Sequence, residues 1–397
     1  MLPLAGITVL TLEHAVAAPF ATRQLADLGA RVIKVERPGV GDFARHYDES
    51  VAGMASYFVW LNRSKESITL DVKSHDGRKI LHELVDSADV LVQNLGPGAV
   101  GRLGLGSADV RSRDPRKITL DISGWGADGP WAHRKAYDLL VQCEVGLVSM
   151  TGSPEEPAKV GISIADIAAG MYGFSGTLAA LYQRQVTGEG TAVEVSLFEA
   201  LAEWMGQPVL FTAGAGRQPG RFGAQHATIA PYGPYVTGDG HTILMSIQNE
   251  TEWGRFCERF LQRPELANDE RFCANTRRVA HREELNTILA DRFTELDTEH
   301  AVGLLDSARI ANAGVNTVSE FLDHPVLTGR DRWREVATPV GDVRSLLPPI
   351  GLAGTEARMD PVPALGEHTA AVLAELGHTP ADIDRLRAAG TIGKVTS

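Results

Sequence analysis

Ile7-Thr-Val-Leu-Thr-Leu12 and Arg31-Val-Ile-Lys-Val-Glu36 are two β-rich runs, and residues 19–29 between them carry the apolar spacing of a helix that ends in glycine. A strand–helix–strand unit of this kind places both strands parallel in one sheet, joined by a right-handed crossover. The pattern repeats in strands expected at 67–71, 90–93 and 117–122 and in helices expected at 76–88 and 99–104. The fold class is therefore predicted as α/β, with a large Rossmann-like parallel sheet covered by helices on both faces.

The strand–helix alternation does not continue through the rest of the chain. A long apolar helix is expected at about 167–185 and a strand at 191–197, whereas residues 214–223 are rich in Gly and Arg and lack periodicity. A smaller α+β domain is predicted after this linker, with a hairpin at 232–247, helices at 252–262, 282–295 and 298–308, and a later C-terminal helical pair at 369–389. The predicted organisation is a large domain at 1–213, a smaller domain at 214–330, and a return segment at 331–397 that packs on the large domain.

Composition narrows the class of protein. Hydrophobic residues make up 44% of the 397 residues and the net charge is −12, so a nucleic acid is not expected as the partner. The three cysteines, Cys143, Cys257 and Cys273, are far apart, which predicts no zinc site, no disulfide framework and a reducing, cytoplasmic location. The start of the chain lacks the basic region of a signal peptide, and no stretch is expected to be long and apolar enough to span a membrane.

Asp166 stands between a segment poor in polar residues and the long apolar helix. An aspartate at this place is a candidate helix N-cap, because its side-chain oxygen can accept hydrogen bonds from the free amides of the first turn. The helix start is also expected to lower the pKa of a carboxylate and keep it ionised, which suits a nucleophile. Local sequence leaves both interpretations open.

Arg and Lys residues stand beside glycine-rich backbone in four clusters, each close to the end of a predicted strand. Ligands bind at the carboxyl ends of the strands in such sheets, and the combination of cations with accessible backbone suits phosphate groups. One cluster alone is typical of a solvated loop, but four of them on an acidic protein indicate a single phosphorylated ligand. The clusters lie at 35–45, 62–73, 94–102 and 124–138.

A series of different short motifs is spread along nearly the whole chain. They are Leu25-Ala-Asp-Leu-Gly-Ala30, Val32-Ile-Lys-Val-Glu-Arg-Pro38, Gly41-Asp42, Asn62-Arg-Ser-Lys65, Ser67-Ile-Thr-Leu-Asp71, Asn94-Leu-Gly-Pro-Gly98, Gly124-Trp-Gly126, Ala136-Tyr-Asp138, Ala165-Asp166, Gly188-Glu-Gly190 and Leu365-Gly-Glu-His-Thr369. Each motif is weak alone, and the combination is specific. The set resembles the class III coenzyme A transferase family (CaiB–BaiF type), and is most similar to its dicarboxylate and mesaconyl-CoA transferase subgroup.

The resemblance implies particular roles. The family's nucleophilic aspartate falls on Asp166, which would attack an acyl-CoA thioester to give a mixed anhydride and then an enzyme thioester. Amides at the start of the Asp166 helix are expected to stabilise the oxyanions. The implied substrates are an acyl-CoA and a small carboxylic acid, with no permanently bound cofactor and no metal, and the implied assembly is an interlocked, linked-ring homodimer. The residues expected to contact coenzyme A are Ala18, Arg37, Leu70, Lys73, Asn94, Leu95, Arg102, Lys135 and Tyr137.

Two alternative functions stay open. The α-methylacyl-CoA racemases of the same superfamily use a histidine in a Gly-His-Asp motif, whereas this chain has Ala136-Tyr137-Asp138. A tyrosine is a poor base at neutral pH, which favours the transferase. The third interpretation is a non-catalytic CoA-binding protein, and the presence of Asp166 together with every cation cluster argues against it.

The sequence defines the acid that accepts coenzyme A less clearly. Residues 247–253 resemble the subgroup that uses C4 and C5 dicarboxylates such as succinate, malate, citramalate or mesaconate. A helix start that Asn249 caps and a solvated acidic turn are the alternative explanations for the same residues. Arg45, His226 and Tyr232 are candidate contacts for a free carboxylate. The sequence does not distinguish transfer between two acids from transfer within one diacid.

Overall fold

The computed structural model describes residues 1–393, which form two compact units. The first unit combines residues 1–146 and 160–207 with the chain from Leu327 onward, and the second combines 147–159 with 208–326. The segment 147–159, expected within the large domain, therefore belongs to the second unit. Hydrogen bonds explain this placement, because Arg221 donates to the carbonyl groups of Ser153 and Pro154 and the amide of Gly223 donates to Gly152.

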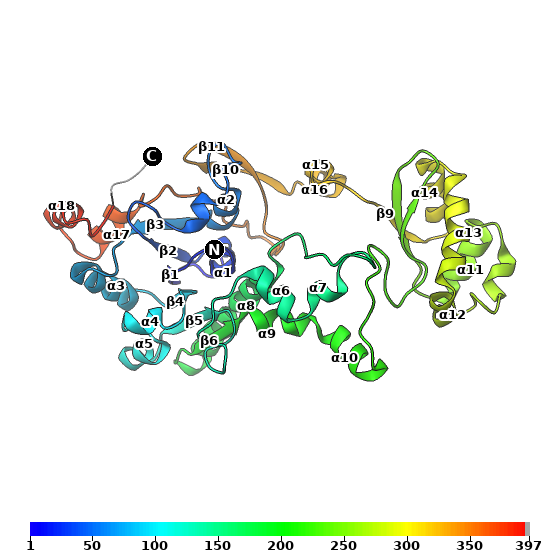
Figure 1. Cartoon of the computed structure of the whole chain (residues 1–397). Coiled ribbons are helices and arrows are strands. Elements are labelled where there is room, and N and C mark those ends of the chain that lie inside the picture. Colours follow the sequence, from blue (N-terminus) through cyan, green and yellow to red (C-terminus); the bar gives the residue numbers. More distant parts are fainter. Residues whose placement is uncertain (394–397) are drawn as a thin grey trace. The chain divides into compact units, whose positions relative to one another are not determined.

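A six-stranded parallel sheet forms the centre of the first unit (Figure 1). Its strand order is β3-β2-β1-β4-β5-β6, so the direction of winding reverses between β1 and β4. The α/β prediction is confirmed, and each expected strand of the sheet lies within two residues of its place. The strands are β1 (Thr8–Leu12), β2 (Arg31–Glu36), β3 (Lys65–Thr69), β4 (Val90–Gln93), β5 (Ile118–Ser123) and β6 (Ala192–Ser196).

Helices cover both faces of this sheet because successive strand residues point to opposite sides. Leu10 and Leu91 share a buried apolar cluster with residues of α3, α17 and α18 on one face. Leu120 and Ile122 lie against Gly173 of α8 on the other. The helices of this unit up to Gln207 are α1 (Ala17–Asp27), η1 (Phe43–His46), α2 (Ser56–Asn62), α3 (His75–Ser87), α4 (Ala99–Arg102), α5 (Ser107–Arg113), α6 (Asp138–Glu144), α8 (Ile164–Thr187) and α9 (Leu197–Trp204).

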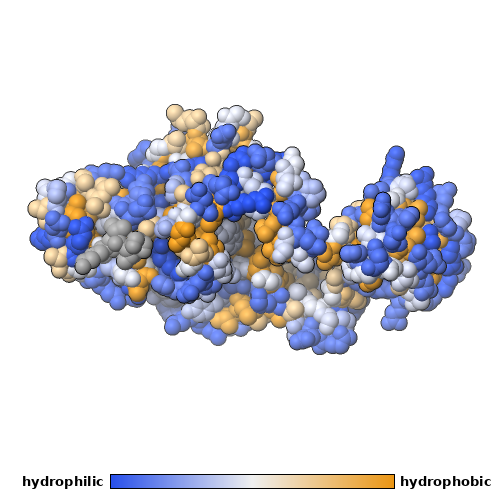
Figure 2. All heavy atoms as spheres, turned by 90° about the horizontal axis from the view of Figure 1, so that it is seen from above, coloured by the Kyte–Doolittle hydropathy of each residue, from blue (hydrophilic) through white to orange (hydrophobic). Residues whose placement is uncertain are grey.

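Helix α8 is long and apolar enough, by length and composition, to cross a membrane. The expectation that no stretch of the chain reaches this length was therefore wrong. The helix packs on α1, β5, β6 and α9, and the core helix of an α/β domain meets the same criteria. Its outward side leaves Met171, Tyr172, Tyr182 and Val186 exposed. Figure 2 shows that hydrophobic patches interrupt the mostly hydrophilic surface of the protein.

The second unit is a smaller α+β structure, as predicted. Its antiparallel sheet has the order β7-β8-β9, and stacked aromatic rings fill the core beside it, among them Trp253, Phe256 and Phe293. Its strands are β7 (Tyr232–Val236), β8 (Thr242–Ser246) and β9 (Ala311–Gly314), and its helices are α7 (Leu147–Met150), α11 (Glu250–Arg259), η2 (Pro264–Asn268), α12 (Asn275–Ala280), α13 (Arg282–Thr294), α14 (Thr298–Ser307) and α15 (Val318–Leu322). Helices α10 (Gly206–Ala215) and α16 (Pro325–Gly329) lie where the chain passes between the units.

The last part of the chain returns to the first unit and lies along β3, which is an edge strand. After a hairpin of β10 (Trp333–Thr338) and β11 (Gly341–Leu346), the amide of Gly366 donates to the Ser67 hydroxyl, and the Thr369 hydroxyl accepts from the amide of Thr69. Helices α17 (Thr369–Glu375) and α18 (Pro380–Ala388) then add Leu373 and Leu386 to the sheet core. The predicted C-terminal helical pair and its return to the sheet are observed.

Candidate active site

Asp166 lies in the first turn of α8, which begins at Ile164 after Ser163. Asp166 is thus the third residue of the helix, and the prediction that it is itself the N-cap was wrong by three positions. Ser163, at the N-cap position, makes no capping bond with its side chain. The Asp166 carboxylate is half-buried and makes no hydrogen bond with residues 1–393. It is therefore free to react.

Asp138 supplies the cap that Ser163 lacks. It is the first residue of α6, and its Oδ1 accepts hydrogen bonds from the amides of Ala165 at 2.7 Å and Asp166 at 3.4 Å. These are amides of the first helical turn, which have no partner within a helix. The expectation that the same amides stabilise the oxyanions of the reaction is wrong for this structure, because a carboxylate already occupies them.

The pKa of Asp166 moves in the direction opposite to the one predicted. Burial raises the pKa of Asp166, and the charge of Asp138 raises it further, to about 7. The prediction counted the positive end of the helix, which stabilises a carboxylate, but Asp138 neutralises that end and adds a like charge. At neutral pH the group is divided between an ionised nucleophile and a neutral acid.

Two glycines bring the parts of the site together. Gly170, one turn after Asp166, lies so close to α1 that a Cβ atom there would be 2.7 Å from the carbonyl oxygen of Ala17. Gly124, directly after β5, lies where a Cβ atom would overlap the Cβ of Ala136. Any larger residue would force the backbone apart at either place. The start of α8 is thereby held against the start of α1, and the Tyr137–Asp138 segment is held at the end of β5.

Tyr47 interacts electrostatically with Asp166. Burial raises the pKa of its hydroxyl to about 12, and the charges of Asp42 and Asp166 and the nearby Tyr137 add to the effect. Asp42, Asp166 and Tyr137 therefore each lie within electrostatic range of Tyr47. The Tyr47 hydroxyl keeps its proton at neutral pH and is a donor for a carbonyl oxygen bound at Asp166.

All nine residues expected to contact coenzyme A lie in the first unit, after the carboxyl ends of β1 to β5. Because the five strands are parallel and adjacent, these ends meet at one edge of the sheet. Among them, Arg37, Lys73 and Arg102 are exposed, and none pairs with a carboxylate of residues 1–393. Ala18 is buried in the first turns of α1, and Lys135 and the 63% exposed Tyr137 follow β5.

Three of the residues predicted to contact coenzyme A also make hydrogen bonds within the protein. The Asn94 side chain accepts from the amide of His14 and donates to its carbonyl, both at 2.9 Å, and so joins the loops after β4 and β1. Leu70 is buried, and its amide donates to the carbonyl of Glu36. The amide of Leu95 donates to the Gln93 side chain. These residues shape the place where the sheet reverses direction, and contact with a ligand stays a prediction for each.

A buried ionic network lies under this edge of the sheet. The Glu13 carboxylate accepts hydrogen bonds from Lys65 at 2.7 Å, Lys34 at 3.3 Å and the hydroxyl of Thr22 at 2.7 Å, and Lys34 also pairs with Asp42 at 2.7 Å. Burial alone would raise the pKa of Glu13, but Lys65 and Lys34 outweigh it and hold that pKa at about 2. The network fixes the loop between β1 and α1, since the amide of Ala15 donates to Asp42.

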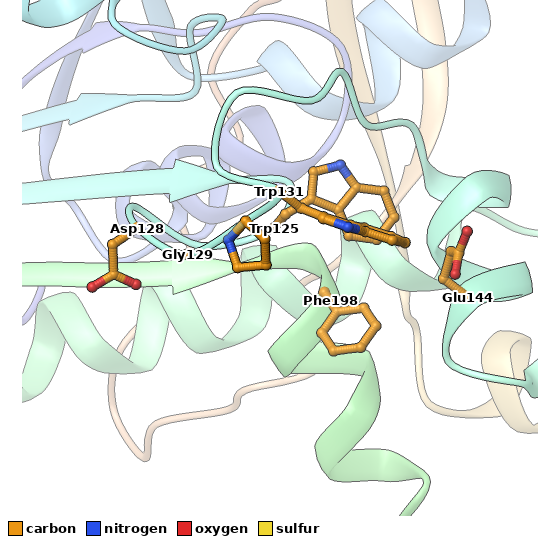
Figure 3. A pocket seen from close by; sticks show the side chains of 7 residues that line it. Trp125, Asp128, Gly129, Trp131, Glu144 and Phe198 are labelled. Atoms are coloured by element: carbon orange, nitrogen blue, oxygen red, sulfur yellow. The ribbon is translucent and has the colours of Figure 1, made fainter.

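An open aromatic pocket of about 340 Å³ lies in the loop that leads from β5 to α6 (Figure 3). Trp125 and Trp131 meet edge to face with ring centres 4.9 Å apart, and Phe198 of α9 lies 5.8 Å from Trp125. Arg134 covers Trp131 at 3.8 Å. The pocket does not include Asp166. It fixes the loop that carries Lys135 and Tyr137.

The candidate contacts for a free carboxylate have neighbours within the protein, and contact with a carboxylate stays a prediction for each. Arg45 makes a two-pronged ion pair with Glu36 and stacks on Phe58 at 3.6 Å. His226 and Tyr232 stack on each other in the second unit, with ring centres 5.2 Å apart. At the start of α11, Asn249 caps the helix through the amide of Glu252 at 2.9 Å. Residues 247–253 are thus explained by the helix start.

Three features of the site were not predicted from the sequence: the presence of Tyr47, the capping role of Asp138, and the hydrogen bond from Gln142 to Asp138. An acidic residue at a predicted helix start with a polar residue four positions later, as in Asp138 and Gln142, was the available signal. Tyr47 had none, because only folding brings it to Asp166. Within residues 1–393, no three His, Cys, Asp or Glu side chains gather so that they could hold a metal ion.

Comparison with known proteins gives a consistent result. The description of CoA-transferase family III matches residues 4–369. The succinyl-CoA:glutarate CoA-transferase of Homo sapiens is 33% identical over 98% of this chain and 90% of that protein. The succinyl-CoA:mesaconate CoA-transferase of Haloarcula hispanica is 32% identical over 94% of this chain and 96% of that protein.

A solved structure agrees with both relatives. The crystal structure of a CaiB/BaiF family protein from Brucella suis is 33% identical, covers 94% of this chain and 99% of its own, and superposes with a TM-score of 0.82. The match therefore spans the sheet, the Asp166 helix and the second unit. The chain belongs to the class III coenzyme A transferases, the CaiB/BaiF family.

Proposed function

We propose that this enzyme transfers coenzyme A from an acyl-CoA to a free dicarboxylic acid through covalent intermediates on Asp166. The observation that carries the proposal is the state of the Asp166 carboxylate. It lies at a helix start, half-buried and without a hydrogen bond in the described chain, whereas Asp138 and the buried Glu13 and Asp42 are all paired. An unpaired carboxylate in a confined site suits a nucleophile.

The first half of the reaction builds an enzyme thioester. A carboxylate oxygen of Asp166 attacks the thioester carbonyl carbon, the C–S bond breaks, and coenzyme A leaves as a thiolate from the mixed anhydride. The thiolate then attacks the Asp166 carbonyl carbon of the anhydride, and the first acid leaves as its carboxylate. Tyr47 keeps its proton and is proposed to donate a hydrogen bond to the oxygen that gains charge.

The second half repeats these steps in reverse order. The acceptor carboxylate attacks the Asp166 thioester, and the thiolate leaves from a new anhydride. The thiolate attacks the acceptor carbonyl carbon, which forms the product thioester and frees Asp166. Every bond broken is matched by one of similar energy, so the enzyme needs mainly to hold the thiolate close and keep water out.

The cations at the sheet edge are proposed to hold coenzyme A. Arg37, Lys73 and Arg102 are free to pair with its phosphates, and Ala18, Lys135 and Tyr137 are proposed to contact the pantetheine arm. The acceptor is proposed to be a C4 or C5 dicarboxylate, because the relatives described above act on glutarate and mesaconate. Transfer within one diacid and transfer between two acids use the same steps.

An isotope experiment tests the reaction class. With succinyl-CoA labelled in its coenzyme A portion and dissolved in heavy water, we expect label to appear in the thioesters of glutarate, citramalate or mesaconate, and not in that of butyrate, which lacks the second carboxylate. We expect no deuterium at the α-carbon of a 2-methylacyl-CoA in the same time, since a tyrosine occupies the position of the racemase histidine. Both products are read by mass. Rapid α-exchange without transfer to any acid would make the protein a racemase.

The interlocked homodimer is also proposed. Its support is an exposed apolar stripe on α8 formed by Met171, Tyr172, Tyr182 and Val186, with Trp204 of α9 donating a hydrogen bond to the Tyr172 hydroxyl at 3.3 Å. Side chains of this kind are rarely left in water over a contiguous surface, and an isologous partner would cover them. The long return of the chain to the first unit is compatible with linked rings.

Subunit exchange distinguishes linked rings from an ordinary dimer. We expect a mixture of two differently labelled preparations to stay unmixed for days at nanomolar concentration, because interlocked chains separate only on unfolding. Unfolding and refolding the mixture should then give hybrid dimers, which mass photometry or native mass spectrometry detects. A folded monomer on dilution, or hybrids formed without unfolding, would contradict the proposed assembly.

A further inference from the structure

A short chain of hydrogen bonds lies behind Asp166. One carboxylate oxygen of Asp138 holds the amides of Ala165 and Asp166, and the other accepts from the Gln142 side-chain amide at 2.7 Å. The Gln142 carbonyl oxygen accepts in turn from the amide of Val160 at 3.0 Å, where the chain re-enters the first unit. Gln142 is completely buried. The orientation of Asp138 is therefore fixed from both sides.

We propose that Asp138, oriented by Gln142, is a positioning residue that caps α8 in place of a local N-cap and withholds the first-turn amides from the Asp166 carboxylate. The inference rests on the proposed role of Asp166 as nucleophile. An aspartate at the third position of an ordinary helix start would be stabilised by the positive helix end. Here the Asp138 carboxylate occupies the positive helix end, so the negative charge of Asp166 is not stabilised by it.

The arrangement has a consequence for the reaction. While Asp166 is ionised, two carboxylates with no cation between them share one helix start, which costs free energy. Acylation of Asp166 removes its charge and ends the repulsion, whereas release of the free carboxylate restores it. The interaction thus favours the anhydride and the thioester over the resting enzyme, which is how an electrostatic contact accelerates a covalent step.

Among residues 1–393, no other charged group of the surrounding elements offers a competing explanation for the raised pKa of Asp166. Tyr47, directly after η1, is within electrostatic range of Asp166, and Tyr137 precedes Asp138. The elements packed on α8 otherwise carry ionisable groups that are paired or exposed: Arg23 with Asp27 on α1, Asp121 with Gln93 and Ser107 on β5, Glu199 with Ser196 on α9, and the exposed Glu194 on β6. Asp138 is the one charge that raises the pKa of Asp166 beside the effect of burial.

The test measures the rate at which Asp166 is acylated by succinyl-CoA, without an acceptor acid, as a function of pH. In wild type the rate should rise with pH through about 7 and then level off, because only the ionised carboxylate attacks. In Asp138→Asn the profile should move to lower pH by roughly one unit, giving about tenfold faster acylation near pH 5.5. Above pH 8 the variant should be slower, because a less basic carboxylate is a weaker nucleophile.

Matched variants separate charge from structure. Asp138→Glu keeps the carboxylate and should keep the wild-type profile, and Asp109→Asn, which changes the third residue of α5, should leave it unchanged. A merely structural role for Asp138 would lower the rate by the same factor at every pH, and the crossing of the two profiles is the signature of the proposal. Identical profiles for wild type and Asp138→Asn would overturn it.

The two proposals fail in different ways. If wild type forms no adduct on the Asp166 peptide, the proposed function falls and this inference with it. If the adduct forms but Asp138→Asn shows no shift, only the inference is lost. Should Asp138→Asn not fold, wild type still decides, because an acylation rate already level above pH 5 would mean an ordinary carboxylate and would contradict the proposed role of Asp138.

Discussion

Asp166→Ala is expected to lower the rate of coenzyme A transfer by at least about a thousandfold, because the variant has no group that can form the anhydride or the thioester. Affinity for free coenzyme A should stay within a small factor of wild type, since Arg37, Lys73 and Arg102 lie at the strand ends and not on α8. With acyl-CoA present, wild type should yield a hydroxylamine-sensitive adduct on the Asp166 peptide and the variant none. Transfer kinetics, calorimetry and peptide mass mapping measure the three effects.

The control uses the same helical position in another helix. Asp109 is the third residue of α5, as Asp166 is of α8, and it is exposed. Asp109→Ala should leave the transfer rate unchanged at a similar small cost to helix stability. An Asp166→Ala enzyme that still transferred coenzyme A would reduce Asp166 to a residue of the helix start and require another nucleophile.

Glu13→Gln should destabilise the protein by roughly 3–5 kcal/mol, because it leaves Lys34 and Lys65 buried with one carboxylate fewer. Gln keeps the size and an acceptor oxygen, so the loss comes from charge. Thermal or denaturant unfolding measures it, with an expected fall in Tm on the order of 10 °C. The matched control is Glu66→Gln, which removes the partly exposed pair with Arg31 on the same sheet and should cost at most about 1 kcal/mol.

The effect should depend on pH in a defined sense. The lowered pKa of Glu13 stabilises wild type above the ordinary glutamate range, and this contribution is lost as pH falls towards about 2. Glu13→Gln has no carboxylate to protonate at this position, so its stability should not show this loss at low pH. Burial lowers the pKa of Lys65 to about 8 although Glu13 opposes it, so without Glu13 this lysine should lose its proton more readily. The deficit of the variant should therefore shrink from pH 7 to 9, and a deficit constant over that range would contradict the ionic origin.

The sequence predicted the sheet well because local pattern and topology agree there. A strand such as Val90–Gln93 is apolar, short and bounded by polar turns, and the parallel order then follows from the helices between the strands. The position of the nucleophile, Asp166, was predictable only through the family resemblance. The helix start itself was misplaced, because Ser163 occupies the cap position without capping, and the residue that does cap lies 25 positions earlier in the chain.

The electrostatics of the site could not be read from the sequence for the same reason. The pKa of Asp166 depends on Asp138 and on burial, and both are set by the close packing at Gly124 and Gly170. Tyr47 comes to Asp166 through the loop after β2 and has no sequence signal of its own. The sequence also did not show that Arg45, a candidate contact for a free carboxylate, is paired with Glu36.

The return of the chain to β3 has a consequence for synthesis on the ribosome. The strand is made early, yet the groups that cover its outer edge, from Gly366 to Thr369, are made about 300 residues later. During that interval a nascent chain carries an unprotected edge strand, which is a template for pairing with other chains. Such distant contacts also slow folding. We therefore expect the growing polypeptide to depend on chaperones, and truncation before residue 366 to yield aggregates instead of a smaller soluble unit.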